Sequence, residues 1–143
     1  MIFKKDFTVR FDQADPAGIL FFGQAFFIAH QTIEEFVNHL GIEWKDWFQN
    51  GQWGVPIRHA EADFKRPLFP GHKYLAQLQI ENLGNSSIRF QVKFFDGDSV
   101  CAHLILSHVF TDVNTLKSRP IPEDLRKLLL PYEVNELPGT NLA

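Results

Sequence analysis

The sequence predicts an α+β fold in which a curved antiparallel β-sheet wraps around one long central α-helix. Only residues 23–40 show apolar side chains at helical spacing over a long stretch. Most of the remaining chain alternates between apolar and polar residues, which is typical of strands with one buried face. Because a sheet and a helix must each bury an apolar face, we expect the sheet to fold around that helix.

The chain has 143 residues, of which 45% are hydrophobic and 15 are Phe. We expect one domain over residues 1–132 and a frayed C-terminal tail over residues 133–143. The many Phe residues indicate a large aromatic core or an apolar surface covered by self-association. The formal net charge of −3 argues against a nucleic-acid-binding protein, which usually carries a basic stripe.

The single cysteine, Cys101, excludes an internal disulfide and a cysteine-based zinc cluster. The charged start, Met1-Ile2-Phe3-Lys4-Lys5-Asp6, does not fit a signal peptide, and no stretch approaches the roughly 20 apolar residues needed to cross a bilayer. We therefore expect a cytoplasmic protein that does not act in the membrane.

The N-terminal third reads as a strand, a tight turn and a helix. Residues 3–11 alternate, with Phe7, Val9 and Phe11 on one face. An Asp-Pro-Ala-Gly turn follows, and Gly41 is a plausible end of the helix. The apolar stripe of the helix comprises Phe22, Phe26, Ala29, Ile33, Phe36, Val37 and Leu40.

Strands dominate the rest of the chain. Asp96-Gly97 predicts a tight hairpin turn, and the apolar run 99–113 predicts a central strand covered on both faces. A short helix is expected over 123–130. The other predicted strands are 53–64, with a bend at Pro56, 72–83 and 86–95.

Two carboxylates stand immediately before a run of large apolar residues. Asp12 and Asp15 precede Ile19-Leu20-Phe21-Phe22. Pro16 and Gly18 lie between Asp15 and this apolar run. An acid held against apolar side chains is costly, so such an arrangement usually marks a position where the charge is used. Without further information, Asp15 reads equally well as an acid that stabilises the turn.

The strand, this segment and the helix together resemble the hot-dog fold thioesterases, within the 4-hydroxybenzoyl-CoA thioesterase group. The resemblance rests on Phe11-Asp12 and on Asp15-Pro16-Ala17-Gly18-Ile19-Leu20-Phe21-Phe22. More narrowly, the chain resembles the 1,4-dihydroxy-2-naphthoyl-CoA hydrolases of phylloquinone and menaquinone biosynthesis. The resemblance implies a hot-dog domain that hydrolyses acyl-CoA, with Asp15 as nucleophile or general base.

The start of the predicted helix offers free backbone N–H groups and the positive end of the helix dipole. We expect the N–H groups of Phe22 and Gly23 to stabilise the oxyanion. His59 is considered as a polar group near the acyl slot. The expected substrate-binding residues are Gly18, Leu20, Phe21, Phe22, Gln24, Phe26 and His59.

Coenzyme A needs cations or N–H donors for its phosphates. In the hydroxybenzoyl relatives an Arg/Lys-rich turn between the third and fourth strands supplies them, but the matching positions here are Gly84, Asn85 and Ser86. This departure leaves two explanations open: loose CoA binding, or an acidic acyl carrier protein that presents the substrate. The candidate CoA-binding residues are Lys65, Arg66, Asn85, Ser86 and Ser87.

No cofactor is expected. The six histidines show no His-x-x-x-His spacing, and the chain lacks a Gly-x-Ser-x-Gly motif and a phosphate-binding glycine loop with Lys. The resemblance thus favours a thioesterase for 1,4-dihydroxy-2-naphthoyl-CoA, with hydroxybenzoyl-CoA or a short-chain acyl-CoA next. A non-catalytic acyl-CoA sensor or acyl-carrier-binding module is the alternative. Since a lone sheet leaves an apolar edge exposed, we expect a homodimer assembled into a homotetramer.

Overall fold

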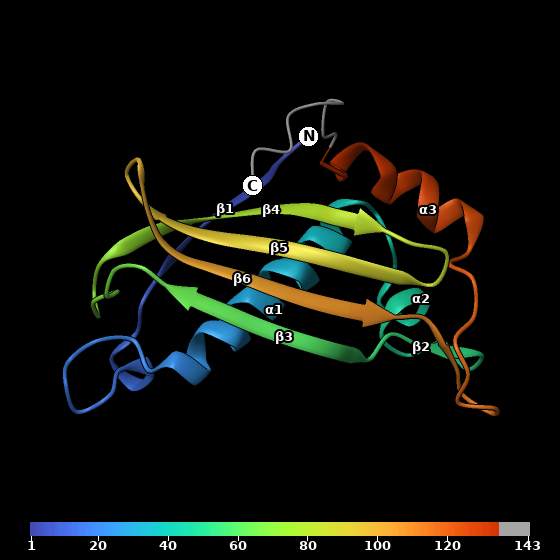
Figure 1. The fold of residues 1–143 in the computed structure, drawn as a ribbon, viewed down its shortest axis with the longest axis horizontal. Helices are drawn as coiled ribbons and strands as arrows, with labels where there is room; N and C mark the ends of the chain where they lie inside the picture. Colours follow the sequence, from blue (N-terminus) through green and yellow to red (C-terminus); the bar gives the residue numbers. More distant parts are fainter. Residues whose placement is uncertain (135–143) are drawn as a thin grey trace.

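A computed structural model describes residues 1–134 of the chain. Five antiparallel strands form a curved sheet in the order β1-β4-β5-β6-β3, and the helix α1 (Phe22–His39) lies against its inner face (Figure 1). This is the arrangement that the sequence predicts. The strands are β1 (Phe3–Thr8), β3 (Ile57–Phe64), β4 (Lys73–Leu83), β5 (Ser87–Asp96) and β6 (Ser99–Val109).

Shorter elements complete the described chain. They are the 3-10 turns η1 (Phe11–Gln13) and η2 (Leu130–Tyr132), the helices α2 (Trp44–Trp47) and α3 (Glu123–Leu129), and a small sheet of β2 (Trp53–Gly54) and β7 (Thr111–Asp112). Within residues 1–134, no helix is both long and apolar enough to cross a membrane.

The inner face of the sheet forms the core with one side of α1. Alternation along β4 and β5 is confirmed over most of both strands, because every second side chain from Tyr74 to Ile80 and from Ile88 to Phe94 is at most 3% exposed. These residues are Tyr74, Ala76, Leu78 and Ile80 on β4, and Ile88, Phe90, Val92 and Phe94 on β5. The hairpin at Asp96-Gly97 is also confirmed, since Asp96 pairs with Ser99 and Gly97 has φ +57°.

The helix α1 has the predicted extent and ends as expected, with Gly41 at φ +78°. Its predicted apolar stripe is correct from Ala29 to Val37 but wrong at its start. Phe22 is 61% exposed and packs on the ring of Phe21, with ring centroids 4.8 Å apart. Because Phe22 occupies the first turn of the helix, its ring lies on the surface and outside the core.

Three strand predictions need correction. The first strand ends at Thr8, and Phe11 is 92% exposed, because the chain turns at η1 once Val9 has paired with Gly71 and His72. The strand predicted over 53–64 is interrupted at Val55-Pro56, as the expected bend indicates. The run 99–113 is divided into β6 and β7, and β5 rather than β6 is the middle strand of the sheet.

The predicted fraying from residue 133 is wrong for its first two residues. Glu133 accepts a hydrogen bond from the N–H of Leu83 (2.6 Å), and the N–H of Val134 donates to the carbonyl of Ile80 (2.8 Å). These contacts hold the chain against the end of β4. Residues 135–143 of the predicted tail lie outside the described residues.

Candidate active site

Asp15 is held in a tight turn between η1 and α1. Its N–H donates to Ile19 (2.9 Å), its carbonyl accepts from the N–H of Gly18 (2.9 Å), and its Oδ1 accepts from the N–H of Ala17 (2.9 Å). Gly18 has φ +78°, a conformation that favours glycine. The turn-stabilising role is therefore present, but it uses one carboxylate oxygen. Within the described chain, Oδ2 accepts no hydrogen bond.

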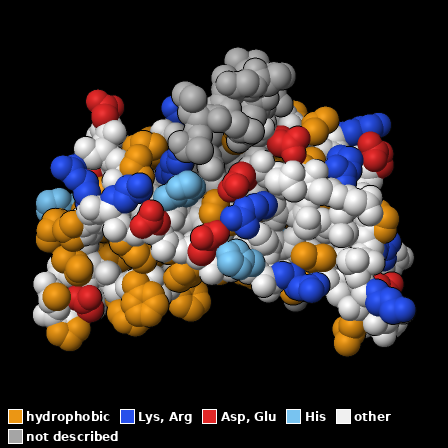
Figure 2. All heavy atoms as spheres, in the orientation of Figure 1, with side chains coloured by type: hydrophobic (Ala, Val, Ile, Leu, Met, Phe, Trp, Pro, Cys, Tyr) orange, Lys and Arg blue, Asp and Glu red, His pale blue; other side chains and the backbone are white. Residues whose placement is uncertain are grey.

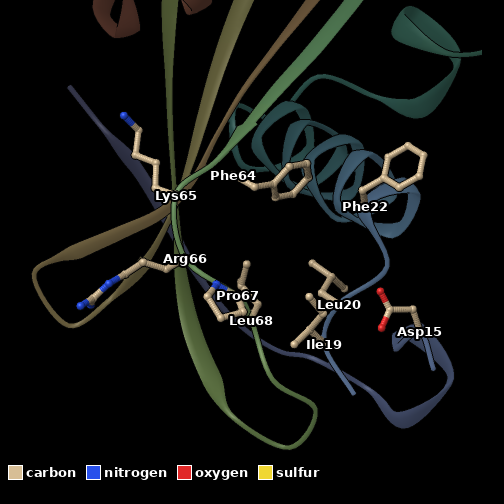
Figure 3. A pocket seen from close by; sticks show the side chains of 9 residues that line it. All are labelled: Asp15, Ile19, Leu20, Phe22, Phe64, Lys65, Arg66, Pro67 and Leu68. Carbon is tan, nitrogen blue, oxygen red and sulfur yellow. The ribbon is translucent and has the colours of Figure 1, made fainter. Parts of the chain in front are cut away.

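The half-buried carboxylate of Asp15 lies in a cavity of about 330 Å³ between the start of α1 and the segment after β3 (Figure 3). A hydrogen bond from the N–H of Leu20 to the carbonyl of Leu68 (2.7 Å) joins the two walls. The volume is within the range of small-molecule sites. The other lining residues are Ile19, Leu20, Phe22, Phe64, Lys65, Arg66, Pro67 and Leu68.

The first turn of α1 borders this cavity through Phe22. The helix has no side-chain cap, and the N–H of Gln24 is occupied by the carbonyl of Phe21 (2.9 Å). The N–H groups of Phe22 and Gly23 precede it and have no hydrogen-bond partner among the described residues. An acceptor beside this turn would meet free donors and the positive end of the helix dipole.

Gly23 is close to an aromatic ring. A Cβ atom at this position would lie 2.8 Å from Cε2 of Phe21, so the Phe21 ring fills the space that the missing side chain leaves. The glycine lets the 44% exposed Phe21 ring fold back over the helix start.

The structure places the predicted acyl-binding residues in different surroundings. Leu20 and Phe22 line the cavity with Asp15, while Gly18 shapes the turn beneath it. Gln24 is half-buried on α1 and does not line this cavity. Phe26 lines a second cavity of about 450 Å³ between α1 and β3, together with Phe27, His30, Gln31, Glu34, Ile57, Ala60 and Leu106.

His59 does not lie in either of these cavities. It is exposed on the outer face of the sheet, where its Nε2 is 3.3 Å from Oε1 of Glu61. Its neighbour Ala60 faces α1, and alternation along β3 turns His59 to the opposite face. The sequence could not reveal this, because the face that β3 presents depends on the bulge between Ile57 and His59.

The candidate CoA-binding residues lie at two opposite ends of the sheet (Figure 1). Lys65 and Arg66 follow β3 and line the cavity that holds Asp15. Asn85, Ser86 and Ser87 form the turn between β4 and β5, beside α3. Phe64 and Leu68 also line the site but were not predicted to do so, because they are about 50 positions from Asp15 and only the folded sheet brings them to it.

A pair of stacked histidines, which no sequence pattern indicates, lies between α1 and β6. The rings of His30 and His108 stack with centroids 5.6 Å apart, and His108 is 1% exposed. Burial lowers the pKa of His108 to about 4, and burial also lowers the pKa of His30. The Nδ1 of His108 is 3.0 Å from the carbonyl of Val55, while its Nε2 is buried without a partner among the described residues. Both rings are therefore neutral near pH 7.

Comparison with known proteins supports the expected resemblance. The sequence profile of the thioesterase-like superfamily matches residues 9–129. The 1,4-dihydroxy-2-naphthoyl-CoA hydrolase of Nostoc punctiforme is 32% identical over 125 residues, covering 87% of this chain and 84% of that protein. The enzyme of the same name from Synechococcus elongatus is 31% identical over 123 residues, covering 85% and 90%.

Solved structures show the same fold. A thioesterase superfamily protein from Jannaschia sp. has a TM-score of 0.81 at 27% identity, covering 93% of this chain and 94% of its own. A 1,4-dihydroxy-2-naphthoyl-CoA thioesterase from Synechocystis has a TM-score of 0.84 at 20% identity, covering 91% and 96%. The predicted hot-dog fold and the predicted resemblance to its thioesterases are confirmed.

Proposed function

This chain belongs to the thioesterase-like superfamily, and on that basis we propose that it hydrolyses 1,4-dihydroxy-2-naphthoyl-CoA to the free acid and CoA. Two relatives that are at least 31% identical are 1,4-dihydroxy-2-naphthoyl-CoA hydrolases, which supports this substrate. The observation that carries the proposal is the position of Asp15. Its carboxylate lies in a mainly apolar cavity bordered by the first turn of α1, where the N–H groups of Phe22 and Gly23 have no partner among the described residues.

Two reaction routes are open to Asp15. As a general base, its carboxylate takes a proton from water, the water oxygen attacks the thioester carbon, and the departing thiolate receives that proton. As a nucleophile, it attacks the carbonyl carbon and releases the thiolate, and water then hydrolyses the mixed anhydride. In both routes the carbonyl oxygen becomes negative. The N–H groups of Phe22 and Gly23 then stabilise that charge.

The walls of the cavity suit a flat aromatic acyl group. Phe22 lies on one side and Phe64 on the other, and Leu20 and Leu68 form apolar surface between them. Aromatic rings favour offset-stacked or edge-to-face neighbours, which these Phe side chains can supply. The same surface would also accept a hydroxybenzoyl group, which makes hydroxybenzoyl-CoA the nearest competing substrate.

We further propose that the protein acts as a homodimer that assembles into a homotetramer in the cytoplasm. The edge strand β3 exposes apolar side chains, including Ile57 (43% exposed) and Phe64 (42% exposed), and Phe27 on α1 is 64% exposed beside it. In Figure 2, apolar side chains gather at the lower left, where α1 begins and the edge strand β3 ends. Covering such a surface by a second copy is the expected use of an exposed apolar edge.

Release of free thiol from a panel of thioesters tests the proposed activity. The panel contains 1,4-dihydroxy-2-naphthoyl-CoA, a hydroxybenzoyl-CoA and a short-chain acyl-CoA. We expect the highest kcat/KM with the naphthoyl substrate. Preference for another acyl group would reject the substrate assignment but keep the thioesterase. Tight binding of acyl-CoA with no thiol release would favour the non-catalytic sensor instead.

A further inference from the structure

We infer that Lys65 and Arg66 bind the phosphates of the CoA nucleotide, an inference that rests on the proposed function. Both residues directly follow β3 and line the cavity that contains Asp15. Figure 3 shows their side chains extending from the rim, away from Asp15. This direction suits CoA, because the pantetheine arm separates its phosphates from the thioester.

The backbone of this cationic pair is fixed, although its side chains are exposed. The N–H groups of Lys65 and Arg66 both donate to the carbonyl of Cys101, at 2.8 and 3.1 Å. Pro67 follows and restricts Arg66 to extended backbone conformations. A fixed backbone places both charges at the rim before a ligand arrives, which reduces the entropy lost on binding.

The two cations are available to an anion. Lys65 has one distant carboxylate neighbour, Asp63, at 3.9 Å, and both side chains are more than half exposed. Such an exposed ion pair contributes little to stability. Within residues 1–134, Arg66 forms no ion pair, whereas Arg10 and Lys73 are each 3.2 Å from a carboxylate. A phosphate at Lys65 and Arg66 would therefore displace no strong partner.

The cation beside the turn between β4 and β5 is already engaged by that turn. The guanidinium of Arg126 donates to the carbonyls of Gly84 (2.5 Å) and Asn85 (3.1 Å). The N–H of Ile121 also donates to Asn85, and the N–H of Phe110 donates to Ser86, at 2.9 and 2.8 Å. Its nearest cation thus holds the turn to α3. The cavity with Asp15, by contrast, has two cations at its rim, Lys65 and Arg66.

A binding experiment that needs no turnover tests the inference. Adenosine 3′,5′-bisphosphate, a fragment of CoA, is titrated calorimetrically into the full chain, into the double variant Lys65→Gln/Arg66→Gln, and into Lys127→Gln. Lys127 is an exposed lysine on α3, at the opposite end of the sheet. We expect the double variant to bind about tenfold more weakly or worse, and the Lys127 variant to bind as the wild type. Equal affinity in the double variant, or no binding by the wild type, would overturn the inference.

A kinetic comparison separates this inference from the proposed function. The double variant is assayed with an acyl-CoA and with the corresponding acyl-pantetheine, which lacks the nucleotide. We expect KM to rise about tenfold for the acyl-CoA only, with kcat unchanged for both thioesters. An equal loss on both thioesters would overturn the nucleotide role. An acylated carrier protein is assayed as a third substrate. A loss seen only with this substrate would also overturn the nucleotide role and assign the pair to that partner. If the wild type hydrolyses neither thioester, the proposed function fails, while the calorimetric result still decides the nucleotide site.

Discussion

The two ends of the sheet differ in how their polar groups are used. Several polar groups at the end with Asp15 have no partner among the described residues. They are Oδ2 of Asp15, the N–H groups of Phe22 and Gly23, and the guanidinium of Arg66. At the end with Asn85, backbone carbonyls are occupied by Arg126, Ile121 and Phe110. Because free polar groups bind ligands and satisfied ones stabilise the fold, the first end is suited to function and the second to stability.

The largest effect is expected at the end with Asp15. Replacing Asp15 by Asn keeps an oxygen for the N–H of Ala17, so the turn persists while the base or nucleophile is lost. We expect kcat to fall by about 10²–10⁴-fold with unchanged urea unfolding. Thiol release measures the rate, and Asp12→Asn is the control, since Asp12 is exposed and pairs with Arg10. A rate that survives Asp15→Asn would remove the catalytic assignment.

The second prediction concerns His108, near the end of the sheet with Asn85. Its folded pKa of about 4 lies below the 6.5 of an ordinary histidine, so the unfolded chain binds the proton more tightly. The contribution of neutral His108 to the free energy of unfolding is complete above about pH 6.5. This contribution decreases as the pH falls towards 4, by about 3 kcal/mol in all. Urea unfolding at pH 7.5 and 4.5 measures this.

The variant His108→Phe should show a smaller loss of stability between those two pH values, because Phe carries no titrating group. The same dependence in His108→Phe as in the wild type would show that other groups cause it.

A third prediction tests whether Arg126 stabilises the fold at the end with Asn85. Replacing Arg126 by Ala removes its hydrogen bonds to the carbonyls of Gly84 and Asn85. We expect the free energy of unfolding to fall by about 2 kcal/mol, with kcat per folded molecule unchanged. Urea unfolding and thiol release measure the two quantities, with Lys127→Ala as the control. A fall in kcat with no change in stability would reverse the comparison of the two ends.

The smallest effect is expected at Gly18. A Cβ here would meet no atom within 4 Å, so the cost of Gly18→Ala arises only from the backbone at φ +78°. We expect about 1 kcal/mol of destabilisation and a lower kcat, because the N–H of Gly18 bonds to Asp15. Gly51→Ala, which also has open space but no positive φ, is the control. Equal stability of the two variants would show that the turn is not strained by a side chain.

Much of the fold could be predicted because its elements are local patterns. Alternation identified the inner faces of β4 and β5, and the helical period identified α1 with its end at Gly41. Errors occurred where long-range contacts overrule the local pattern. Phe11 continues the alternation of β1 but is exposed, because the strand ends at Thr8 and the chain turns at η1 after Val9 has paired with the β3–β4 connection.

Neighbouring residues are enough to specify the sheet, the helix and the acid at the turn before it, because strand alternation, helical period and turn chemistry are local patterns. The distant residues that join Asp15 depend on the folded core. Folding brings Phe64, Lys65 and Arg66 to the cavity and leaves His59 and Asn85 elsewhere. Strand order, register and bulges are settled by burial of the whole core, and a shift of one residue in register moves a side chain to the other face.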